Sequence, residues 1–318
     1  ECNNYIVFVK AEDNVGNVKI YGSNGVVLEN NTQDISVTYE ENPGKNVESK
    51  KEKYGDIYVN YYSENVTLCM QAYESGSVYS GLKQMGYQVS YVYGDGTTEK
   101  DEEIIEKESP QNVKLGELDA YRTITKEWEF ESKKDNSQVI TVTAPAGKTM
   151  DNAGNTMEND AVHTLVIDSK PPTVKADYKQ ENNEHCFRNE KYANSDVTYK
   201  VTVTERFLKD ITVSINGKDY TLDELETEKT QASLGIKEIT KNELPDITKT
   251  TDQTEYVFSI VFDKDGKYKV KTIATDAAGN TGSDTENKDG FEFIIDTVAP
   301  TLDLTYTAKQ NNTETHLA

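Results

Sequence analysis

The chain has 318 residues, of which 56 are acidic and 34 are basic, so its formal net charge is −22. This length suits two or three domains of roughly 100 to 200 residues each. The acidic field repels phosphate groups, which excludes nucleic acid and anionic membrane surfaces as expected partners. A hydrophobic fraction of 35% predicts small cores with much exposed surface.

Cysteine and histidine are rare, with three copies of each. Cys2, Cys69 and Cys186 are odd in number and widely spaced, so we expect neither a disulfide framework nor a structural zinc site. The sequence holds no apolar run of about 18 residues, and we therefore predict no membrane span in this segment. Because the chain opens at Glu1 without a leader pattern, we interpret it as a piece of a longer protein.

An acidic turn rich in Gly and Asn occurs three times along the chain. It reads "AEDNVGNV" from Ala11, "MDNAGNTM" from Met150 and "TIATDAAGNTG" from Thr272. Gly and Asn tolerate positive φ, so we expect each copy to close a hairpin between the last two strands of a domain.

Two further blocks repeat with almost the same period. Segments 26–39, 165–178 and 293–306 align over fourteen residues without a gap, and each carries an acid at the same place: Glu29, Asp168 and Asp296. The second block, "YYSENVTLCMQAYE" at 61–74, matches "YANSDVTYKVTVTE" at 192–205. The offsets are 128 residues between the last two acids and 131 residues between the second blocks. Fixed periods of this kind indicate repeated structural units.

The repeats divide the chain into four parts. Residues 1–30 are predicted to be the C-terminal strands of a preceding repeat, and 31–168 and 169–296 two complete domains. Residues 297–318 are predicted to begin a following repeat. The Pro-bearing links between them are short, which predicts limited orientations between neighbouring domains.

Within each repeat the apolar residues alternate with polar ones. In the segment 197–204, Val and Tyr residues occupy every second position, which predicts strands with one apolar face. An Asn-Gly turn at Asn216 predicts a hairpin, and Tyr268 is placed to form a tyrosine corner. Short helices are expected at 101–108 and 222–229. The predicted fold class is all-β, with tandem immunoglobulin-like β-sandwiches.

The stretches "TDAAGNT…FIIDTVAPTLDLTY" and "VTYKVTVTERFLKDITVSING" resemble the tandem bacterial Ig-like repeats of large Gram-positive surface proteins. "SGLKQMGYQVSYVYGDG", from Ser80 to Gly96, resembles one strand region of the same repeats. The resemblance covers nearly the whole chain. It implies an extracellular protein, cell wall-attached or secreted, with roles in spacing, adhesion or display, and it brings no catalytic residues.

The sequence has no GxSxG, HExxH or Cys–His pattern, so we expect no enzyme, and the first kind of candidate site is a metal site. Calcium takes six to eight oxygen ligands from carboxylates and carbonyls. The candidate ligands stand at turns and repeat ends: Asp168, Asp263, Asp265, Asp276 and Asp296. The alternative is that these acids only bond nearby backbone in turns. No other cofactor is expected.

A tyrosine-rich strand offers a second kind of site. Tyr87, Tyr91 and Tyr93 share one face of the segment 87–96. Such rings either stack on sugars or fill the core and rim of a sandwich. Both interpretations stay open on the sequence alone.

Two hypotheses of function follow. The first is a non-catalytic structural stalk or spacer that contacts neighbouring Ig-like repeats in the same chain and holds a head domain away from the cell wall. The second is an adhesin or carbohydrate-binding module that uses the tyrosine face of the first full repeat to bind a host glycan or matrix protein.

Overall fold

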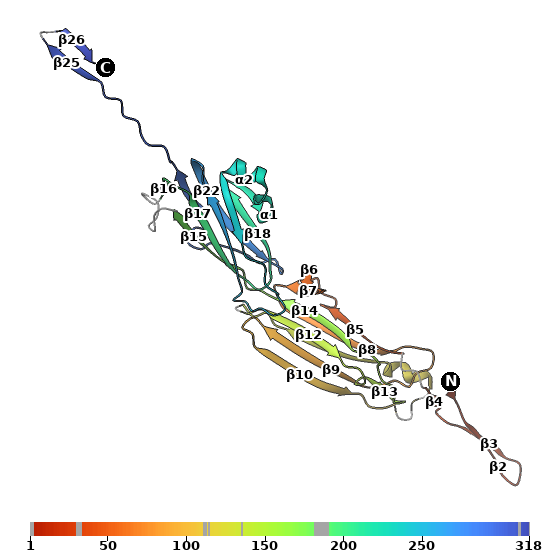
Figure 1. The fold of residues 1–318 in the computed structure, drawn as a ribbon. Coiled ribbons are helices and arrows are strands. Elements are labelled where there is room, and N and C mark those ends of the chain that lie inside the picture. The colour runs from red at the N-terminus through yellow and green to blue at the C-terminus, as the bar shows by residue number, and fades with distance from the viewer. Residues whose placement is uncertain are drawn as a thin grey trace.

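The structure is a computed structural model that describes residues 3–29, 34–110, 113, 115–134, 136–180, 191–310 and 313–317, with side chains left aside at 115, 116 and from 306 onward. Two β-sandwiches lie end to end along one long axis (Figure 1). A hairpin segment projects beyond each of them, one at either end of the chain (Figure 1). None of the described helices is long and apolar enough to cross a membrane.

The first sandwich, residues 35–167, packs a large sheet against a small one. The large sheet has the order β10-β9-β12-β14-β7-β6, with β13 paired to β9, and the small sheet has the order β11-β8-β5. The strands are β5 (Ile35–Glu41), β6 (Lys50–Tyr54), β7 (Ile57–Tyr62), β8 (Val66–Glu74), β9 (Leu82–Tyr93), β10 (Thr98–Glu106), β11 (Thr123–Phe130), β12 (Gln138–Ala144), β13 (Met150–Asp151) and β14 (Ala161–Ile167). A 3-10 helix, η2 (Leu115–Tyr121), precedes β11.

The second sandwich, residues 173–295, is built in the same way. One sheet has the order β15-β17-β21-β20, and the other has the order β16-β24-β22-β18-β19, with β23 paired to β22. The elements are β15 (Thr173–Gln180), β16 (Tyr192–Ala193), β17 (Val197–Thr204), β18 (Leu208–Ile215), β19 (Lys218–Thr221), α1 (Leu222–Leu225), α2 (Glu228–Leu234), β20 (Ile236–Lys241), β21 (Glu255–Phe262), β22 (Gly266–Asp276), β23 (Thr281–Ser283) and β24 (Phe291–Ile295).

The strand order confirms the tandem immunoglobulin-like fold. β5-β8-β11 in the first sandwich corresponds to β15-β17-β21 in the second, and β9-β12-β14-β7 corresponds to β18-β22-β24-β16. Even the parallel pairs match, because β7 pairs with β14 as β16 pairs with β24. The two sequence blocks that repeat therefore occupy equivalent strands.

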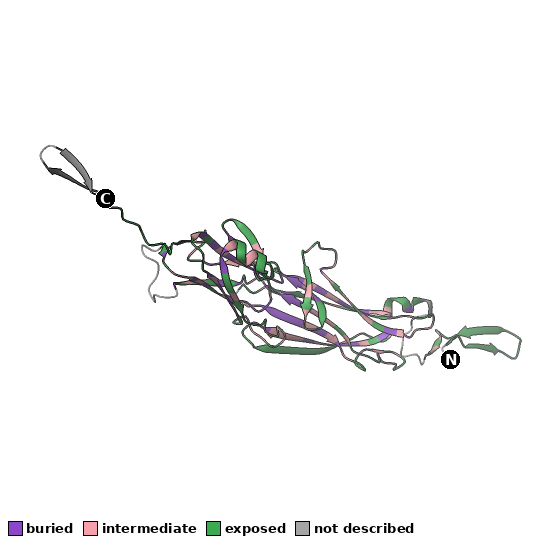
Figure 2. Ribbon diagram, turned by 45° about the horizontal axis from the view of Figure 1, so that its top comes forward, coloured by how far each residue is buried: buried purple, intermediate pink, exposed green. Residues whose placement is uncertain are grey.

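Alternation along the strands fills the two cores. Val197, Tyr199, Val201 and Val203 on β17 point inward and are fully buried, while the residues between them are more exposed. The equivalent strand β8 buries Val66, Leu68, Met70 and Ala72. Buried residues lie inside each sandwich and exposed ones on its outer faces (Figure 2), as expected for sheets that have one wet side.

Three local predictions are confirmed. The hydroxyl of Tyr268 donates to the main-chain carbonyl of Lys264 at 2.9 Å, which is the tyrosine corner. Asn216 and Gly217 have φ of 53° and 82°, and they close the hairpin between β18 and β19. Gly279 has φ of 95° in the turn after β22.

One predicted helix is wrong. Residues 101–108 belong largely to β10, which pairs with β9 from Thr98 to Glu106. β10 is an edge strand whose side chains are exposed apart from the half-buried Ile105. The strand carries five acids and one lysine, and charge on such an edge opposes pairing with other chains. The second predicted helix, at 222–229, appears as the two short helices α1 and α2.

The two end segments are hairpins. The N-terminal one contains β1 (Asn3–Tyr5), β2 (Phe8–Glu12), β3 (Val18–Gly22) and β4 (Val26–Leu28), with β1 paired to β4 and β2 to β3. The C-terminal one contains β25 (Tyr306–Gln310) and β26 (Thr313–Leu317). Phe8, Val9 and Ile20 of the first hairpin are exposed. Figure 2 shows this hairpin exposed along its length. That residues 1–30 complete a preceding repeat stays a prediction.

Candidate metal centre

Three carboxylates meet where the two sandwiches join. Asp168 directly follows β14 of the first sandwich, whereas Glu205 follows β17 and Asp276 ends β22 in the second. One carboxylate oxygen from each lies within 4.8 Å of the others. The three residues are 1%, 6% and 0% exposed. We call this group the joint site.

The turn after β22 fixes two members of the joint site. The Asp276 carboxylate accepts from the backbone N–H of Asn280 on Oδ1 and from its side-chain amide on Oδ2, both at 2.8 Å. The same amide donates to the main-chain carbonyl of Asp168 at 2.8 Å. The repeated acid-to-Asn turn therefore orients one carboxylate and also connects the two sandwiches.

The other two carboxylates each accept a backbone hydrogen bond on one oxygen, which leaves the second oxygen available to a metal ion. Asp168 Oδ1 accepts from the backbone of Lys170 at 3.0 Å, and Glu205 Oε1 accepts from the backbone of Phe207 at 2.8 Å. Among the described residues, the buried Asp168 Oδ2 has no hydrogen-bond partner. An unpaired buried carboxylate oxygen is costly unless a cation or another donor meets it.

Burial shifts the three pKa values upward. Burial, followed by the charge of Asp276, raises the pKa of Asp168 to about 7. Burial, followed by the charge of Asp168, raises the pKa of Glu205 to about 8. Burial also raises the pKa of Asp276, although its bonds to Asn280 oppose the rise. Protons and a cation would therefore compete for the joint site.

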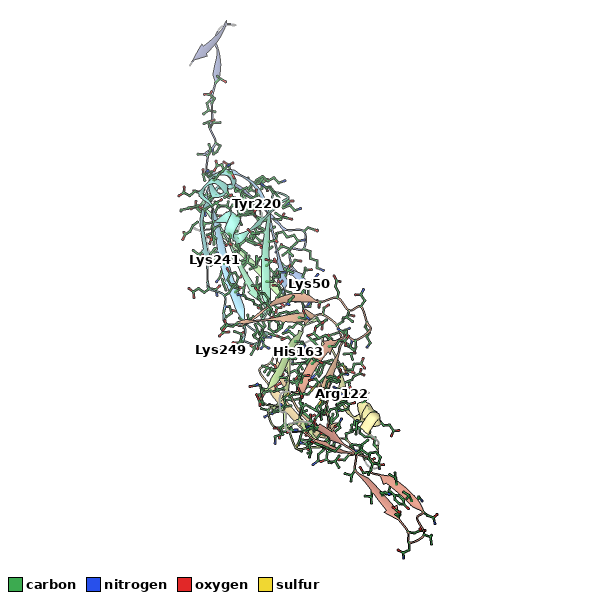
Figure 3. The ribbon with its side chains drawn as sticks, turned by 90° about the vertical axis from the view of Figure 1, so that its right-hand side faces the viewer. Lys50, Arg122, His163, Tyr220, Lys241 and Lys249 are labelled. Carbon is green, nitrogen blue, oxygen red and sulfur yellow. The ribbon has the colours of Figure 1, made fainter. Side chains whose placement is uncertain are left out.

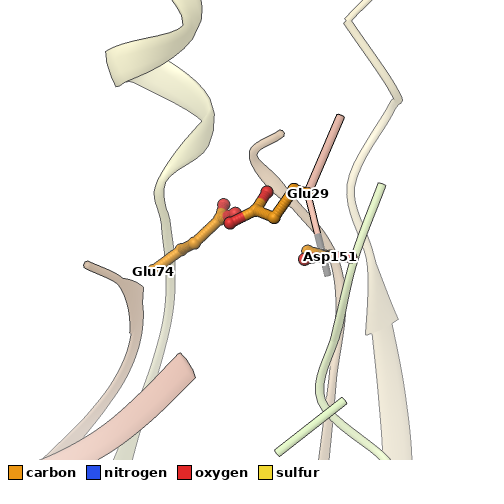
Figure 4. A group of neighbouring side chains, drawn as sticks. All are labelled: Glu29, Glu74 and Asp151. Carbon is orange, nitrogen blue, oxygen red and sulfur yellow. The ribbon is translucent and has the colours of Figure 1, made fainter. Parts of the chain in front are cut away.

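A second group of three carboxylates lies at the other end of the first sandwich. Glu29, Glu74 and Asp151 each offer an oxygen within 4.8 Å of the others, and Figure 4 shows the Glu29 and Glu74 side chains pointing toward one another. Glu74 is fully buried and its Oε2 has no partner among the described residues, and neither has either oxygen of Glu29. Burial, followed by the charge of Glu74, raises the pKa of Glu29 to about 8. We call this group the Glu29 site.

The Glu29 site repeats the hydrogen bonds that Asp276 and Glu205 make in the joint site. Asp151 accepts from the backbone of Asn155 at 2.8 Å and from its side-chain amide at 2.7 Å. Glu74 Oε1 accepts from the backbone of Ser80 at 3.0 Å, as Glu205 does from Phe207. The members correspond one to one along the repeat, so two independent copies of one constellation are present.

The donor set fits calcium. Every ligand in both sites is a carboxylate oxygen, and hard oxygen ligands suit calcium or magnesium rather than zinc or copper. Magnesium keeps several waters and usually binds one or two carboxylates, whereas calcium accepts more carboxylates in a flexible geometry. Three converging carboxylates with unpaired oxygens favour calcium.

The sequence analysis named only part of the joint site. Asp168 and Asp276 were predicted and are brought together, but Glu205 was missed. The signal for Glu205 was present, because both copies of the second repeated block end in Glu, at 74 and 205. A strand-end acid is too common in an acidic chain to stand out without its partners.

The remaining predicted ligands lie at the opposite end of the second sandwich. Asp265 Oδ1 accepts from the backbone of Thr297 at 3.1 Å and from its hydroxyl at 2.8 Å. Asp296 is exposed, and its backbone bonds the carbonyl of Ala193 at 2.9 Å, in the way that Asp168 bonds Tyr62. The structure brings neither of these acids, nor Asp263, into the two carboxylate groups found in the described chain.

The predicted tyrosine face is largely covered. Tyr87 and Tyr93 are 3% and 6% exposed, and their hydroxyls bond Glu103 and Glu99 of the neighbouring strand. The ring of Tyr87 packs edge-on against Trp128, with centroids 5.0 Å apart. Tyr91 is half-buried. The rings therefore offer little free surface for stacking on a sugar.

Other polar groups serve the sandwiches themselves. His163, labelled in Figure 3, lies on β14 with its Nε2 2.7 Å from the carboxylate of Glu41, and its ring stacks on Tyr39. Lys241, also labelled there, bonds Asp223 and Glu226 at 3.2 and 3.1 Å. A cavity of about 280 Å³ next to Lys241 is lined by residues of β18, α1 and the segment after β20.

Comparisons with known proteins give distant likeness only. No family model and no curated protein matches the chain. The dimeric latent PorU from Porphyromonas gingivalis is 12% identical, with 84% of this chain and 24% of that one covered and a TM-score of 0.25. The fibronectin(III)-like modules of CbhA from Clostridium thermocellum are 10% identical, with 82% and 94% covered and a TM-score of 0.24. The C-terminal domain of the antigen I/II-family protein AspA from Streptococcus pyogenes is 11% identical, with 83% and 100% covered and a TM-score of 0.27.

This chain spans 24% of the length of the first of these structures. At such identities and TM-scores, the neighbours carry no argument about activity or partners.

Proposed function

We propose that the chain is a non-catalytic spacer from an extracellular bacterial surface protein, and that calcium bound between successive sandwiches stabilises the array. One observation carries the proposal. A buried carboxylate from the end of one repeat meets two carboxylates of the next, and the group recurs along the chain as Asp168–Glu205–Asp276 and Glu29–Glu74–Asp151.

The placement of the ligands explains how a cation would act. Asp168 belongs to the first sandwich, and Glu205 and Asp276 belong to the second, so one bound ion would connect both bodies directly. Without a cation, three buried carboxylates repel one another, and protonation is the way to relieve that repulsion. A divalent ion removes the repulsion and adds a bond across the joint.

Contacts around the joint site also limit bending. Phe207 of the second sandwich is 1% exposed and packs edge-on against Tyr61 of the first, with ring centroids 5.4 Å apart. Asp252 of the second sandwich accepts from the backbone and the hydroxyl of Ser137 in the first, at 3.1 and 2.6 Å. A spacer needs such fixed joints, whereas a flexible linker would have none of them.

The test is a calorimetric titration of the 318-residue chain with calcium in metal-free buffer. We expect two sites with dissociation constants of roughly 0.1 to 1 mM, the range of extracellular calcium modules. Asp276→Asn should remove one site and leave the other. The matched control Asp263→Asn, in a turn outside both groups, should leave two sites. A titration without binding would overturn the calcium proposal.

The adhesive alternative needs a separate test, because a spacer can also carry a binding face. The chain would be applied to arrays of glycans and host matrix proteins with and without calcium. Saturable binding that survives Asp276→Asn but is lost in Tyr91→Ala would support the adhesin. Because Tyr87 and Tyr93 are buried, we expect no such binding.

A further inference from the structure

The two carboxylate sites share their chemistry but differ in the contacts around them. We propose that the Glu29 site is a cation-dependent contact, in which the bound ion decides whether the segment 3–29 is fixed to the first sandwich. The joint between the two sandwiches, in contrast, keeps its geometry when its ion is removed. This inference rests on the proposed function, because both sites must first bind the cation.

An apolar cluster holds the joint between the sandwiches independently of any ion. Phe207 lies between Tyr61 and Tyr54, with ring centroids at 5.4 and 6.4 Å. The buried members come from both bodies: Val59, Tyr61, Val139, Val166, Phe207, Ala277 and Ala278. Burial of this apolar surface favours the docked arrangement whether or not the carboxylates are neutralised.

Polar contacts add to the same joint. Beside its bonds to Ser137, Asp252 donates its backbone N–H to the carbonyl of Gly94 in the first sandwich at 2.8 Å. The approach is so close that a Cβ on Gly94 would lie 2.1 Å from the Asp252 carboxyl carbon. Lys209 and Glu52 form a further ion pair across the joint at 2.7 Å. Several contacts would have to break before the sandwiches could bend.

At the equivalent face of the first sandwich, no aromatic side chain stands at the position of Phe207. The two bonds that Phe207 makes are divided here between two residues. The N–H that bonds the Glu carboxylate comes from Ser80, and the carbonyl of Gly81 accepts from Asn152 at 2.9 Å, just as the Phe207 carbonyl accepts from Ala277 at 2.8 Å. No side chain fits there, since a Cβ on Gly81 would lie 2.7 Å from Tyr121 Cβ.

The next position on this face is also polar. Asn152 stands where the joint has the apolar Ala277, and its amide bonds the carbonyls of Ser80 and Gly81 at 3.2 and 2.8 Å. The amide nitrogen of Asn152 thus bonds within the first sandwich, whereas its Oδ1 has no partner among the described residues. Neither of these two positions therefore gives a neighbour an apolar side chain to cover.

Glu29 brings the described segment 3–29 into contact with the first sandwich. The residues of this segment are exposed except for Gly25, Val27 and Glu29, which are half-buried. Apart from the Glu29 carboxylate, which lies close to Glu74 and Ser80, the hydrogen bonds of its described residues stay within the segment, as between Val7 and Ser23. Glu29 alone inserts its carboxylate beside Glu74 and Asp151 (Figure 4). Without a cation, an ionised Glu29 is repelled by the two buried acids. No residue of the described segment 3–29 belongs to an apolar cluster like the one at the joint, which would hold it in place.

The experiment measures spin-label distances in the full 318-residue chain, with the three native cysteines replaced by serine. The pair Asn4→Cys and Lys83→Cys reports on the Glu29 site, and the pair Lys83→Cys and Lys229→Cys reports on the joint. With calcium we expect both distance distributions to be narrow. With a chelator, the first should broaden at least twofold while the second keeps its width.

Two matched substitutions complete the design. Glu29→Gln should broaden the first distribution even in calcium, whereas Asp168→Asn should leave the second narrow. Equal broadening of both distributions on chelation, or no change in either, would overturn the inference while leaving the proposed function intact if calorimetry shows two sites. Absence of calcium binding in calorimetry would overturn both.

Discussion

The side-chain amide of Asn280 donates to the main-chain carbonyl of Asp168 at 2.8 Å, across the boundary between the two sandwiches. The same amide holds the carboxylate of Asp276. The turn that occurs once per repeat thus closes a hairpin and also aligns a ligand of one sandwich with a ligand of its neighbour.

Replacing Asn280 by Ala is expected to weaken calcium binding at the joint site. The substitution removes the bonds that orient Asp276, and loss of such outer-shell partners typically costs roughly 10- to 100-fold in metal affinity. Calorimetry would show one of two sites shifted by that factor. Asn155→Ala, its equivalent, should shift the other site instead. Equal effects of either substitution on both sites would contradict the assignment.

Phe207→Ala is expected to loosen the joint. Removal of a buried phenyl ring costs about 3–5 kcal/mol, here shared between two sandwiches. Small-angle scattering in chelator should then show a wider range of shapes than for the parent chain. Phe262→Ala, within the core of the second sandwich, is the control: it should lower that domain's melting temperature without widening the shapes. An unchanged scattering profile for Phe207→Ala would show that Phe207 does not hold the joint.

The architecture could be predicted from the sequence because it depends on local patterns. Residues close together in the sequence determine three of its features: the alternation on β17, the Asn-Gly turn at Asn216 and the corner at Tyr268. The acidic stretch at 101–108 has no local pattern that identifies it as a strand. It pairs as β10 only because the backbone of β9 lies beside it, a contact that no local pattern encodes.

Only part of the joint site could be predicted from the sequence, for a related reason. Repetition singled out Asp168, and the turn singled out Asp276, but Glu205 comes from a third strand that packing alone brings near. Asp252 was invisible for the same reason, because its partner Ser137 lies 115 residues away in the other sandwich. The candidate ligands Asp263, Asp265 and Asp296 are aspartates too, but their carboxylates belong to neither of the two groups found among the described residues.

Gly279→Val is expected to destabilise the second sandwich. The residue has φ of 95°, which a β-branched side chain adopts only under strain of about 1–3 kcal/mol. Space is not the obstacle, since the nearest atom to a new Cβ is Lys50 Cε at 3.5 Å. Calorimetric melting should fall by several degrees. Gly266→Ala, where φ is ordinary and the nearest contact is 3.6 Å, should melt like the parent chain.

Calcium affinity at the joint site is expected to rise with pH. In the folded chain without metal, the pKa of Asp168 is raised to about 7 and that of Glu205 to about 8, from ordinary values of 3.8 and 4.5. The folded chain therefore holds more protons than the unfolded chain between roughly pH 4 and 8, and without metal its stability falls as pH rises through that window.

Calcium must displace those protons, so binding should strengthen by at least about tenfold from pH 5.5 to pH 8 and release protons to the buffer. Titrations in buffers of different ionisation enthalpy measure that release directly. The asparagine variant Asp168→Asn should bind more weakly and with a shallower pH dependence, because one titrating carboxylate is gone. An affinity that stays constant over this range would mean that the carboxylates are already ionised, and that burial at the joint does not hold their protons.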